Sequence, residues 1–262
     1  MSTATGERRV TVVTGASQGI GRVIARKFGT AGDVVVLAAR NGTALSETAG
    51  MVEEAGGVPL VVETDVTSEP SVAAMVEAVV GGHGRIDVLV NNSGVGGPSG
   101  RLWEVDPNEW MSTFQVNVFG VFLVTRAVLP VMVGQKGGSV VIIGSISGKR
   151  PLFGRSAYTT TKTALIGLTR TLALEAGGEG IRVNLISPGF VSGPRIDWVM
   201  NAQAEARGID VDTVRREFES EAALGRLTEP EDVARAAVFL ASDEAGGITG
   251  ADLNVNSGVV MY

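Results

Sequence analysis

The chain has 262 residues, but it contains no cysteine, one histidine and only two tyrosines. Without cysteine it can form neither disulfides nor thiolate metal sites, and one histidine excludes a site of clustered histidines. That residue, His83, stands in the glycine-rich stretch GGHGRID, which is typical of a solvent-facing loop. We therefore expect no metal site, and we expect a carboxylate, a lysine or a tyrosine to carry the proton in any catalysis.

Positive charge is also scarce. There are 22 Lys and Arg against 28 Asp and Glu, and the formal net charge is −6. Nucleic-acid-binding proteins normally carry a basic face, so we expect no nucleic-acid partner. We also expect no membrane partner, because no apolar run approaches the length of a membrane span and MSTATGERRV lacks the apolar core of a signal peptide. The expected location is the cytoplasm.

Apolar residues make up 44% of the chain, and they are distributed in a regular alternation. Short runs rich in β-branched residues alternate with longer amphipathic stretches. Runs that are apolar throughout indicate strands buried on both faces, as in a parallel sheet covered by helices. The pattern predicts an α/β protein with a doubly wound, parallel, seven-stranded sheet: one Rossmann-fold domain over residues 1–262. The predicted strands cover residues 10–15, 34–39, 58–64, 86–92, 139–144, 181–187 and 252–256.

Residues 193–225 break this alternation. The segment is helical, charged and irregularly spaced, and it follows the sixth predicted strand. Ligands of open α/β sheets bind beyond the carboxyl ends of the strands, where this segment would lie. We therefore predict that residues 193–225 form a substrate lid, named here the lid segment. Its Trp198 and Met200 have no obvious predicted element to pack under, and an ordinary pair of surface helices is the alternative.

A glycine-rich motif, TGASQGIG at residues 14–21, joins the first strand to the first helix. Glycine lets the backbone approach a pyrophosphate that rests on a helix N-terminus. Gly15, Gly19 and Gly21 have the spacing G-x-x-x-G-x-G instead of the commoner G-x-G-x-x-G. On this pattern alone, both a dinucleotide site and a tight strand-to-helix turn remain open.

Tyr158 and Lys162 stand four residues apart in SAYTTTKTAL, a stretch poor in charge. Residues at this spacing share one face of a helix. A free phenol has a pKa near 10, and a neighbouring ammonium favours the phenolate and lowers that pKa. The pair is therefore a candidate proton-transfer device.

Together these motifs resemble the classical short-chain dehydrogenase/reductase family, including its 3-oxoacyl-(acyl-carrier-protein) reductase-like members. NNSG (91–94), NVFG (117–120), GSISG (144–148), Tyr158-x-x-x-Lys162 and SPGFV (187–191) follow in the order of the family, over nearly the whole chain. The resemblance implies an NAD(P)H-dependent oxidoreductase that interconverts a ketone and a secondary alcohol of a small molecule. The catalytic residues that it implies are Asn117, Ser145, Tyr158 and Lys162.

The resemblance also implies a role for each of these four residues. Tyr158 would be general acid in reduction and general base in oxidation. Lys162 would bind the nicotinamide ribose, Ser145 the substrate oxygen, and Asn117 a water that connects Lys162 to solvent. The implied cofactor-binding residues are Gly15, Ser17, Gln18, Gly19, Ile20, Gly21, Arg40, Asp65, Val66, Asn92, Gly94, Tyr158, Lys162, Pro188, Gly189 and Val191.

The end of the second predicted strand, LAARN, indicates which cofactor is bound. NAD sites usually carry Asp or Glu there, but this chain has Ala39 followed by Arg40, and Asp33 lies at the other end of the strand. A guanidinium matches the geometry of a 2′-phosphate, which favours NADP over NAD. The alternative is an exposed arginine at the start of a helix. Where many members have a threonine that binds the nicotinamide carboxamide, this chain has Gly193, with Ser192 beside it.

Two other functions remain open. One is reduction of a 3-oxoacyl thioester, against which Glu179 stands, because such reductases tend to place a basic residue there. The other is a non-catalytic NADP-binding regulator. The resemblance further implies a homo-oligomer, a tetramer formed through the two long helices that begin near Pro107 and Ser156. Six cationic residues near the expected site are interpreted as solvated surface charges: Arg101, Lys149, Arg150, Arg155, Arg195 and Arg207.

Overall fold

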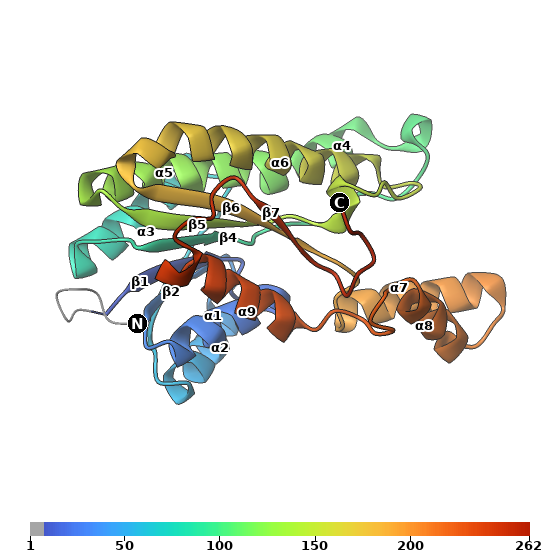
Figure 1. Ribbon diagram of the computed structural model, residues 1–262. Helices are drawn as coiled ribbons and strands as arrows, with labels where there is room; N and C mark the ends of the chain where they lie inside the picture. Colours follow the sequence, from blue (N-terminus) through green and yellow to red (C-terminus); the bar gives the residue numbers. More distant parts are fainter. Residues whose placement is uncertain (1–7) are drawn as a thin grey trace.

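The computed structural model describes residues 8–262, and it contains one parallel sheet of seven strands in the order β3-β2-β1-β4-β5-β6-β7 (Figure 1). The order reverses between β1 and β4, so the prediction of a doubly wound Rossmann fold is confirmed. The strands are β1 (Val10–Thr14), β2 (Val34–Ala39), β3 (Val58–Glu63), β4 (Val88–Asn91), β5 (Gly138–Ile143), β6 (Ile181–Pro188) and β7 (Asp252–Val255).

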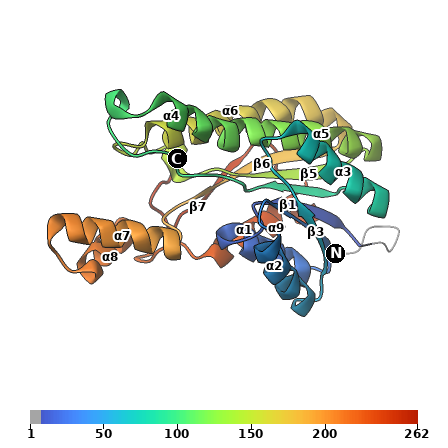
Figure 2. The same ribbon diagram turned by 180° about the vertical axis from the view of Figure 1, so that it is seen from behind.

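Helices cover both faces of this sheet (Figures 1 and 2). On one face lie α3 (Glu69–His83), α4 (Pro107–Phe114), α5 (Gly120–Gln135) and α6 (Ser156–Ala176). On the other lie α1 (Gly19–Thr30), α2 (Gly42–Glu54) and α9 (Pro230–Leu240). Every residue of β1, β2 and β4 is buried, because successive side chains point alternately into two apolar cores. This explains why their sequences are apolar throughout.

The long helix against the sheet contains an irregularity. A π-helical turn, η2 (Gln115–Phe119), separates α4 from α5, and the helical stretch runs on to Gln135. Pro130 lies within α5 without ending it. π-Helical turns are rare and often occur at functional sites. The turn places Asn117 on the buried side of the helix.

This helical stretch, Pro107–Gln135, is also long and apolar enough to span a membrane by length and composition, with a hydropathy of 2.0 over its most apolar window. The expectation that no apolar run reaches that length was therefore wrong. In the structure 44% of the window is buried, and Val121, Val124, Val128 and Met132 belong to the core beside the sheet. One such helix is weak evidence for a membrane protein, because the core helix of a soluble protein has the same composition.

The lid segment contains α7 (Pro194–Arg207) and α8 (Val211–Ser220), which project from the body as a helical hairpin (Figures 1 and 2). Met200 is fully buried in a small separate core with Val214 and Leu227, so the expectation that it lacks a packing partner was wrong. Trp198, in contrast, is 70% exposed. Arg207 forms a paired ionic contact with Glu217 of α8, which joins the two helices.

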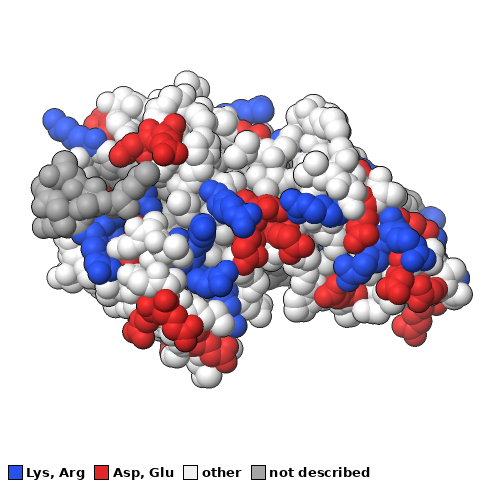
Figure 3. Space-filling view, turned by 60° about the horizontal axis from the view of Figure 1, so that its bottom comes forward, with Lys and Arg blue, Asp and Glu red and all other residues white. Residues whose placement is uncertain are grey.

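The face of the molecule in Figure 3 carries positive and negative side chains in alternation, most densely over the projecting hairpin. Ion pairs such as Arg207–Glu217 and Arg215–Asp197 account for part of this pattern. This face of the protein therefore has no extended basic patch.

Candidate active site

The predicted catalytic residues come together at the carboxyl edge of the sheet. Ser145 follows the end of β5, and Tyr158 and Lys162 lie in the first two turns of α6. Lys162 is 5% exposed, and its Nζ donates a hydrogen bond to the carbonyl oxygen of Ile143 at 2.8 Å. The same Nζ lies 5.7 Å from the centre of the Tyr158 ring. The helix therefore places the ammonium and the half-buried phenol side by side, as their spacing predicts.

The electrostatic surroundings of Tyr158 make the phenol more acidic. Burial raises the pKa of Tyr158, but the positive charges of Lys162, Arg195 and Arg155 and a hydrogen bond with Ser145 together outweigh burial. The net pKa is below the ordinary value of 10. Burial and the charge of Arg195 lower the pKa of Lys162, whereas Tyr158 raises it. A phenol with a lowered pKa can exchange protons nearer to neutral pH.

Ser145 has an extended backbone at the point where the chain leaves β5. Its Oγ accepts a hydrogen bond from the backbone N–H of Ser147 at 3.1 Å and lies 3.2 Å from the Oγ of Ser147. These contacts fix the hydroxyl beside Tyr158, whose pKa it helps to lower. Ser147 is a supporting residue that the sequence analysis did not identify, although its place within GSISG was a possible signal.

Asn117 is fully buried, and its side chain holds the loop after β4. Its Oδ1 accepts from the N–H of Val95 at 2.8 Å, and its Nδ2 donates to the carbonyl of Val95 at 3.0 Å and to Thr161 Oγ1 at 3.1 Å. A Cβ added to Gly94 would lie 3.4 Å from Asn117 Oδ1 and 3.7 Å from Lys162 Nζ, so Gly94 lies between these groups. Asn117 therefore connects the loop, α6 and the π-helical turn; the water predicted beside it stays a prediction.

The glycine motif after β1 forms a closely packed cradle. Gly15 and Gly19 have φ angles of +67° and +55°, which favour glycine. A Cβ on Gly21 would lie 2.2 Å from the carbonyl oxygen of Gly15. The backbone N–H groups at the start of α1 have no partner within the helix, and the side chain of the N-cap, Gln18, does not cap them. Exposed donors at a helix N-terminus fit the pyrophosphate of a dinucleotide cofactor.

Asn92 supports this cradle from the end of β4. Its Nδ2 donates to the carbonyl oxygens of Thr14 at 3.0 Å and Gly15 at 3.2 Å, and its backbone N–H donates to Thr14 Oγ1. Asn92 is a predicted cofactor-binding residue, and in the structure its side-chain amide binds the backbone of the glycine loop. Within the motif Ser17 and Ile20 are half-buried, while Gln18 is exposed.

The end of β2 presents Arg40 to solvent. Among residues 8–262 its guanidinium forms no ion pair or hydrogen bond, although its charge contributes to lowering the pKa of Asp65. Asp65 Oδ1 accepts from the N–H and the Oγ1 of Thr67, and these bonds are the main reason that the pKa of Asp65 is lowered. Val66 is buried against Gly120. Arg40 is therefore free to bind an anion at this edge.

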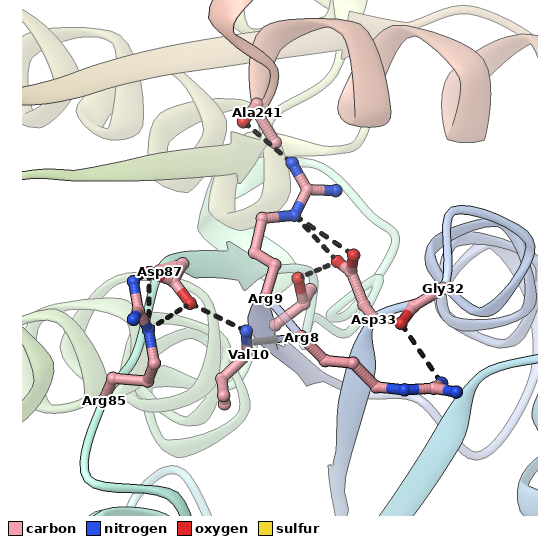
Figure 4. Close-up of polar contacts among 9 residues, drawn as sticks. Arg8, Arg9, Val10, Gly32, Asp33, Arg85, Asp87 and Ala241 are labelled. Carbon is pink, nitrogen blue, oxygen red and sulfur yellow. Dashed lines mark hydrogen bonds and ion pairs between the residues drawn. The ribbon is translucent and has the colours of Figure 1, made fainter. Parts of the chain in front are cut away.

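Asp33, the other acid of β2, is occupied elsewhere (Figure 4). It is fully buried at the amino end of the strand, where Arg9 Nε donates to both of its carboxylate oxygens at 3.0 and 3.1 Å. Thr11 Oγ1 donates to it at 2.5 Å, and Arg9 also reaches the carbonyl of Ala241. Burial raises the pKa of Asp33, although Arg9 and Thr11 oppose the shift. This carboxylate is structural and cannot reach a cofactor at the opposite edge.

The turn after β6 contains the remaining predicted cofactor-binding residues. Pro188 is the last residue of β6, a Cβ on Gly189 would lie 2.8 Å from Asn256 Cα, and Val191 pairs with Thr228. Ser192 Oγ donates to a carboxylate oxygen of Glu229 at 2.5 Å. The hydroxyl of Ser192, the candidate replacement for the family's threonine, therefore already has an acceptor within the protein.

Comparison with known proteins identifies the class to which this fold and site belong. A family model described as enoyl-(acyl carrier protein) reductase matches residues 15–260. The 3-oxoacyl-(acyl-carrier-protein) reductase FabG of Thermotoga maritima is 34% identical over 258 residues, covering 97% of this chain and 99% of that protein. The chain belongs to the short-chain dehydrogenase/reductase family, and it is an oxidoreductase that interconverts ketones and secondary alcohols with a nicotinamide dinucleotide.

Two solved structures show the same architecture with different cofactors. A variant of actinorhodin polyketide ketoreductase with NADPH has a TM-score of 0.91 at 32% identity and covers 100% of both chains. NAD⁺-bound xylitol dehydrogenase has a TM-score of 0.90 at 30% identity, covering 95% of this chain and 98% of that one. The fold is therefore compatible with either cofactor, and the choice between them depends on residues particular to this chain.

Proposed function

We propose that this protein is an NADP(H)-dependent ketoreductase in which Tyr158 exchanges the proton with the substrate. The observation that carries the proposal is the contact between a half-buried Tyr158 and a buried Lys162, whose Nζ lies 5.7 Å from the centre of the Tyr158 ring. Ser145 lies beside this pair, next to the glycine cradle. A protein that only binds a dinucleotide needs the cradle but has no use for an acidified phenol. This favours an enzyme over the alternative of a non-catalytic regulator.

In the proposed mechanism the protein supplies position and protons, while the bound nicotinamide supplies or accepts the hydride. Ser145 holds the substrate oxygen next to the phenol. Tyr158 donates its proton to that oxygen when a ketone is reduced, and it takes the hydroxyl proton when an alcohol is oxidised. Lys162 stabilises the phenolate form and would bind the nicotinamide ribose. Asn117 keeps the loop at Val95 and the helix at Thr161 in register around these groups.

The preference for NADP rests on Arg40. Its guanidinium lies exposed at the carboxyl end of β2 and has no partner within the described residues 8–262, and Ala39 stands where an NAD site would present a carboxylate. A planar fork of donors suits a 2′-phosphate. Gly15, Ser17, Gln18, Gly19, Ile20, Gly21, Asp65, Val66, Gly94, Pro188, Gly189 and Val191 are proposed to line the remainder of the cofactor site.

The lid segment is proposed to close over the bound substrate. It starts five residues after the end of β6 and projects as a hairpin, whose Met200 and Val214 form a small core with Leu227. Trp198 presents an exposed indole from α7 that a bound substrate could cover. Closure of this kind excludes water from hydride transfer.

A second candidate function, reduction of a 3-oxoacyl thioester, is favoured by the 34% identity to the Thermotoga maritima reductase over nearly its full length. Glu179 opposes it, because it places an exposed acid just before β6. We also propose a cytoplasmic homotetramer formed through the surface of α4, α5 and α6. The stacked and exposed Phe119 and Phe122, and the exposed Leu174, support such an interface.

The experiment that tests the proposed function is NADPH oxidation by the purified protein with a panel of ketones, repeated with NADH. Turnover that is faster with NADPH supports the proposal. Binding of NADPH with no turnover of any ketone, thioester or alcohol in either direction would favour the regulator.

A further inference from the structure

The structure divides the six cationic residues around the site into two groups. Four have a partner that explains their position. Lys149 pairs with Asp252, Arg150 with Glu221 and Arg207 with Glu217, while Arg101 stacks on Trp103. The other two, Arg155 and Arg195, form no ion pair with any carboxylate among residues 8–262.

Arg155 and Arg195 both lie against the ring of Tyr158. The guanidinium carbon of Arg195 is 5.3 Å from the ring centre, and that of Arg155 is 5.6 Å away. A Cβ placed on Gly96 would be 2.8 Å from Arg195 Nη2 and 2.9 Å from Arg155 Nη2, so both nitrogens flank a single point. Arg155 comes from the N-cap of α6, and Arg195 comes from the first turn of α7. Two distant parts of the chain therefore bring two positive charges to the proton donor.

This arrangement carries an electrostatic cost. Burial lowers the pKa of Arg155, and the charge of Arg195 lowers it further. Three acids in or near the lid segment have other partners, since Glu221 is bound to Arg150, Asp197 to Arg215 and Glu229 to Ser192. Arg155 Nη2 donates to the carbonyl of Gly96 at 2.6 Å, which fixes its direction while leaving further donors of the fork free.

We propose that Arg155 and Arg195 bind an anionic group of the substrate, a carboxylate close to the reacting carbonyl. This assignment rests on the proposed function, because it takes the phenol of Tyr158 as the place where the carbonyl oxygen binds. A guanidinium group often binds a carboxylate through two parallel hydrogen bonds. Both guanidinium groups lie close to the Tyr158 ring, which limits the distance between the carbonyl and the carboxylate of the substrate. The substrate class is therefore that of short oxo acids and the corresponding hydroxy acids.

The position of Arg195 on α7 adds a consequence for the lid segment. An anion held by both arginines connects the first turn of α7 to α6, so that the bound substrate holds the start of the lid segment where Arg195 already lies against Tyr158. A neutral ketone of the same shape lacks this connection. Selection for the anion therefore acts on the position of the lid segment as well as through direct contact.

The test compares matched substrates on the complete enzyme with its cofactor. The substrate pairs are 2-oxobutanoate and 4-oxopentanoate, each against its methyl ester, with a short 3-oxoacyl thioester as a further neutral substrate. The variants are Arg195→Gln, Arg155→Gln and the charge-conserving Arg195→Lys. Arg101→Gln is the control, because Arg101 carries the same charge near the site but stacks on Trp103.

We expect wild type to favour at least one acid over its ester. Arg195→Gln and Arg155→Gln should each raise KM for that acid at least about tenfold, because each variant loses one charge-assisted hydrogen bond to the carboxylate. KM for the ester should change little, Arg195→Lys should restore part of the difference, and Arg101→Gln should behave as wild type. An equal effect on acid and ester would overturn the proposal and show that the arginines act only through the acidity of Tyr158. Preference for the ester or the thioester would also overturn it.

Calorimetric titration of the NADP⁺ complex with 2-oxobutanoate and with 4-oxopentanoate provides a readout that does not need turnover. Binding of either acid that weakens at least about tenfold in Arg195→Gln supports the anion site even if none of these ketones is reduced. Absence of binding of both acids, or equal binding in wild type and Arg195→Gln, overturns it. Turnover of neutral ketones alone would leave the ketoreductase function intact while the anion site fails.

Discussion

Replacing Gly21 with alanine should weaken cofactor binding although it improves the helix. Alanine in a helix is about 0.8–1 kcal/mol more favourable than glycine. At this position, however, the new Cβ would lie 2.2 Å from the carbonyl oxygen of Gly15 and 2.4 Å from Nδ2 of Asn92. Non-bonded atoms of this kind are most favourable at about 3.5 Å, so the loop must move by about 1 Å.

The consequence of that movement can be estimated. Overpacking of this extent costs about 1–3 kcal/mol, which exceeds the gain in helix propensity. Gly15 and Asn92 form the cradle and its support, so the displacement falls on the backbone proposed to receive the pyrophosphate. We expect the dissociation constant of NADPH to rise at least about tenfold, equivalent to about 1.4 kcal/mol, and the melting temperature to fall.

The assay is NADPH fluorescence titration together with thermal unfolding of the same samples. Gly50→Ala in α2 is the matched control, because an added Cβ there meets no atom within 4 Å. The control should gain up to about 1 kcal/mol of stability and bind NADPH like wild type. If Gly21→Ala also binds NADPH like wild type and melts at a higher temperature, the cradle is not the closely packed cofactor site described above.

Four further tests address other parts of the site. Arg40→Asp should shift preference from NADPH towards NADH at least about tenfold, measured as the ratio of dissociation constants, because a charge-assisted contact is worth about 1.5–3 kcal/mol; an unchanged ratio would show that Arg40 does not bind the 2′-phosphate. Alcohol oxidation needs the phenolate of Tyr158, whose pKa is below 10, so its rate should rise with pH and level off above that pKa, while ketone reduction should fall over the same range. Lys162→Ala should move both profiles to higher pH and weaken NADPH binding, and identical profiles would exclude this role. Trp198→Ala should raise KM for the substrate with little change in NADPH affinity; unchanged KM would mean that the lid segment does not contact substrate.

The order of elements could be predicted from the sequence because the strands in the middle of the sheet, such as β1, β2 and β4, are buried on both faces. Val34–Ala39, for example, is apolar at every position since its alternate side chains enter two different cores. The spacing of Tyr158 and Lys162 predicted their contact for a similar reason, as four residues are about one helical turn. Local periodicity thus determined the sheet and the central pair of the candidate site.

Features that depend on contacts between distant segments could not be predicted in this way. The π-helical turn at Asn117 is one, because its hydrogen bonds lead to Val95 and Thr161. The bond of Asn92 to the glycine loop and the burial of Met200 between α7 and α8 are others. Nothing in the sequence separates Arg155 and Arg195 from the other four cationic residues near the site, because their distinction is that both lie against Tyr158 and form no ion pair within residues 8–262. Tertiary structure alone reveals it.

The most direct test of the central claim is to measure NADPH binding and turnover together in Tyr158→Phe, with the ketone that wild type reduces fastest. The substitution removes one oxygen and keeps the ring that lies beside Lys162, Arg155 and Arg195. General acid–base catalysis contributes at least about 100-fold, so turnover should fall by that factor or more while the dissociation constant of NADPH stays near that of wild type. A variant that binds NADPH normally and keeps more than about a tenth of the wild-type rate, far above what loss of the proton donor allows, would contradict the assignment of Tyr158 as the proton donor.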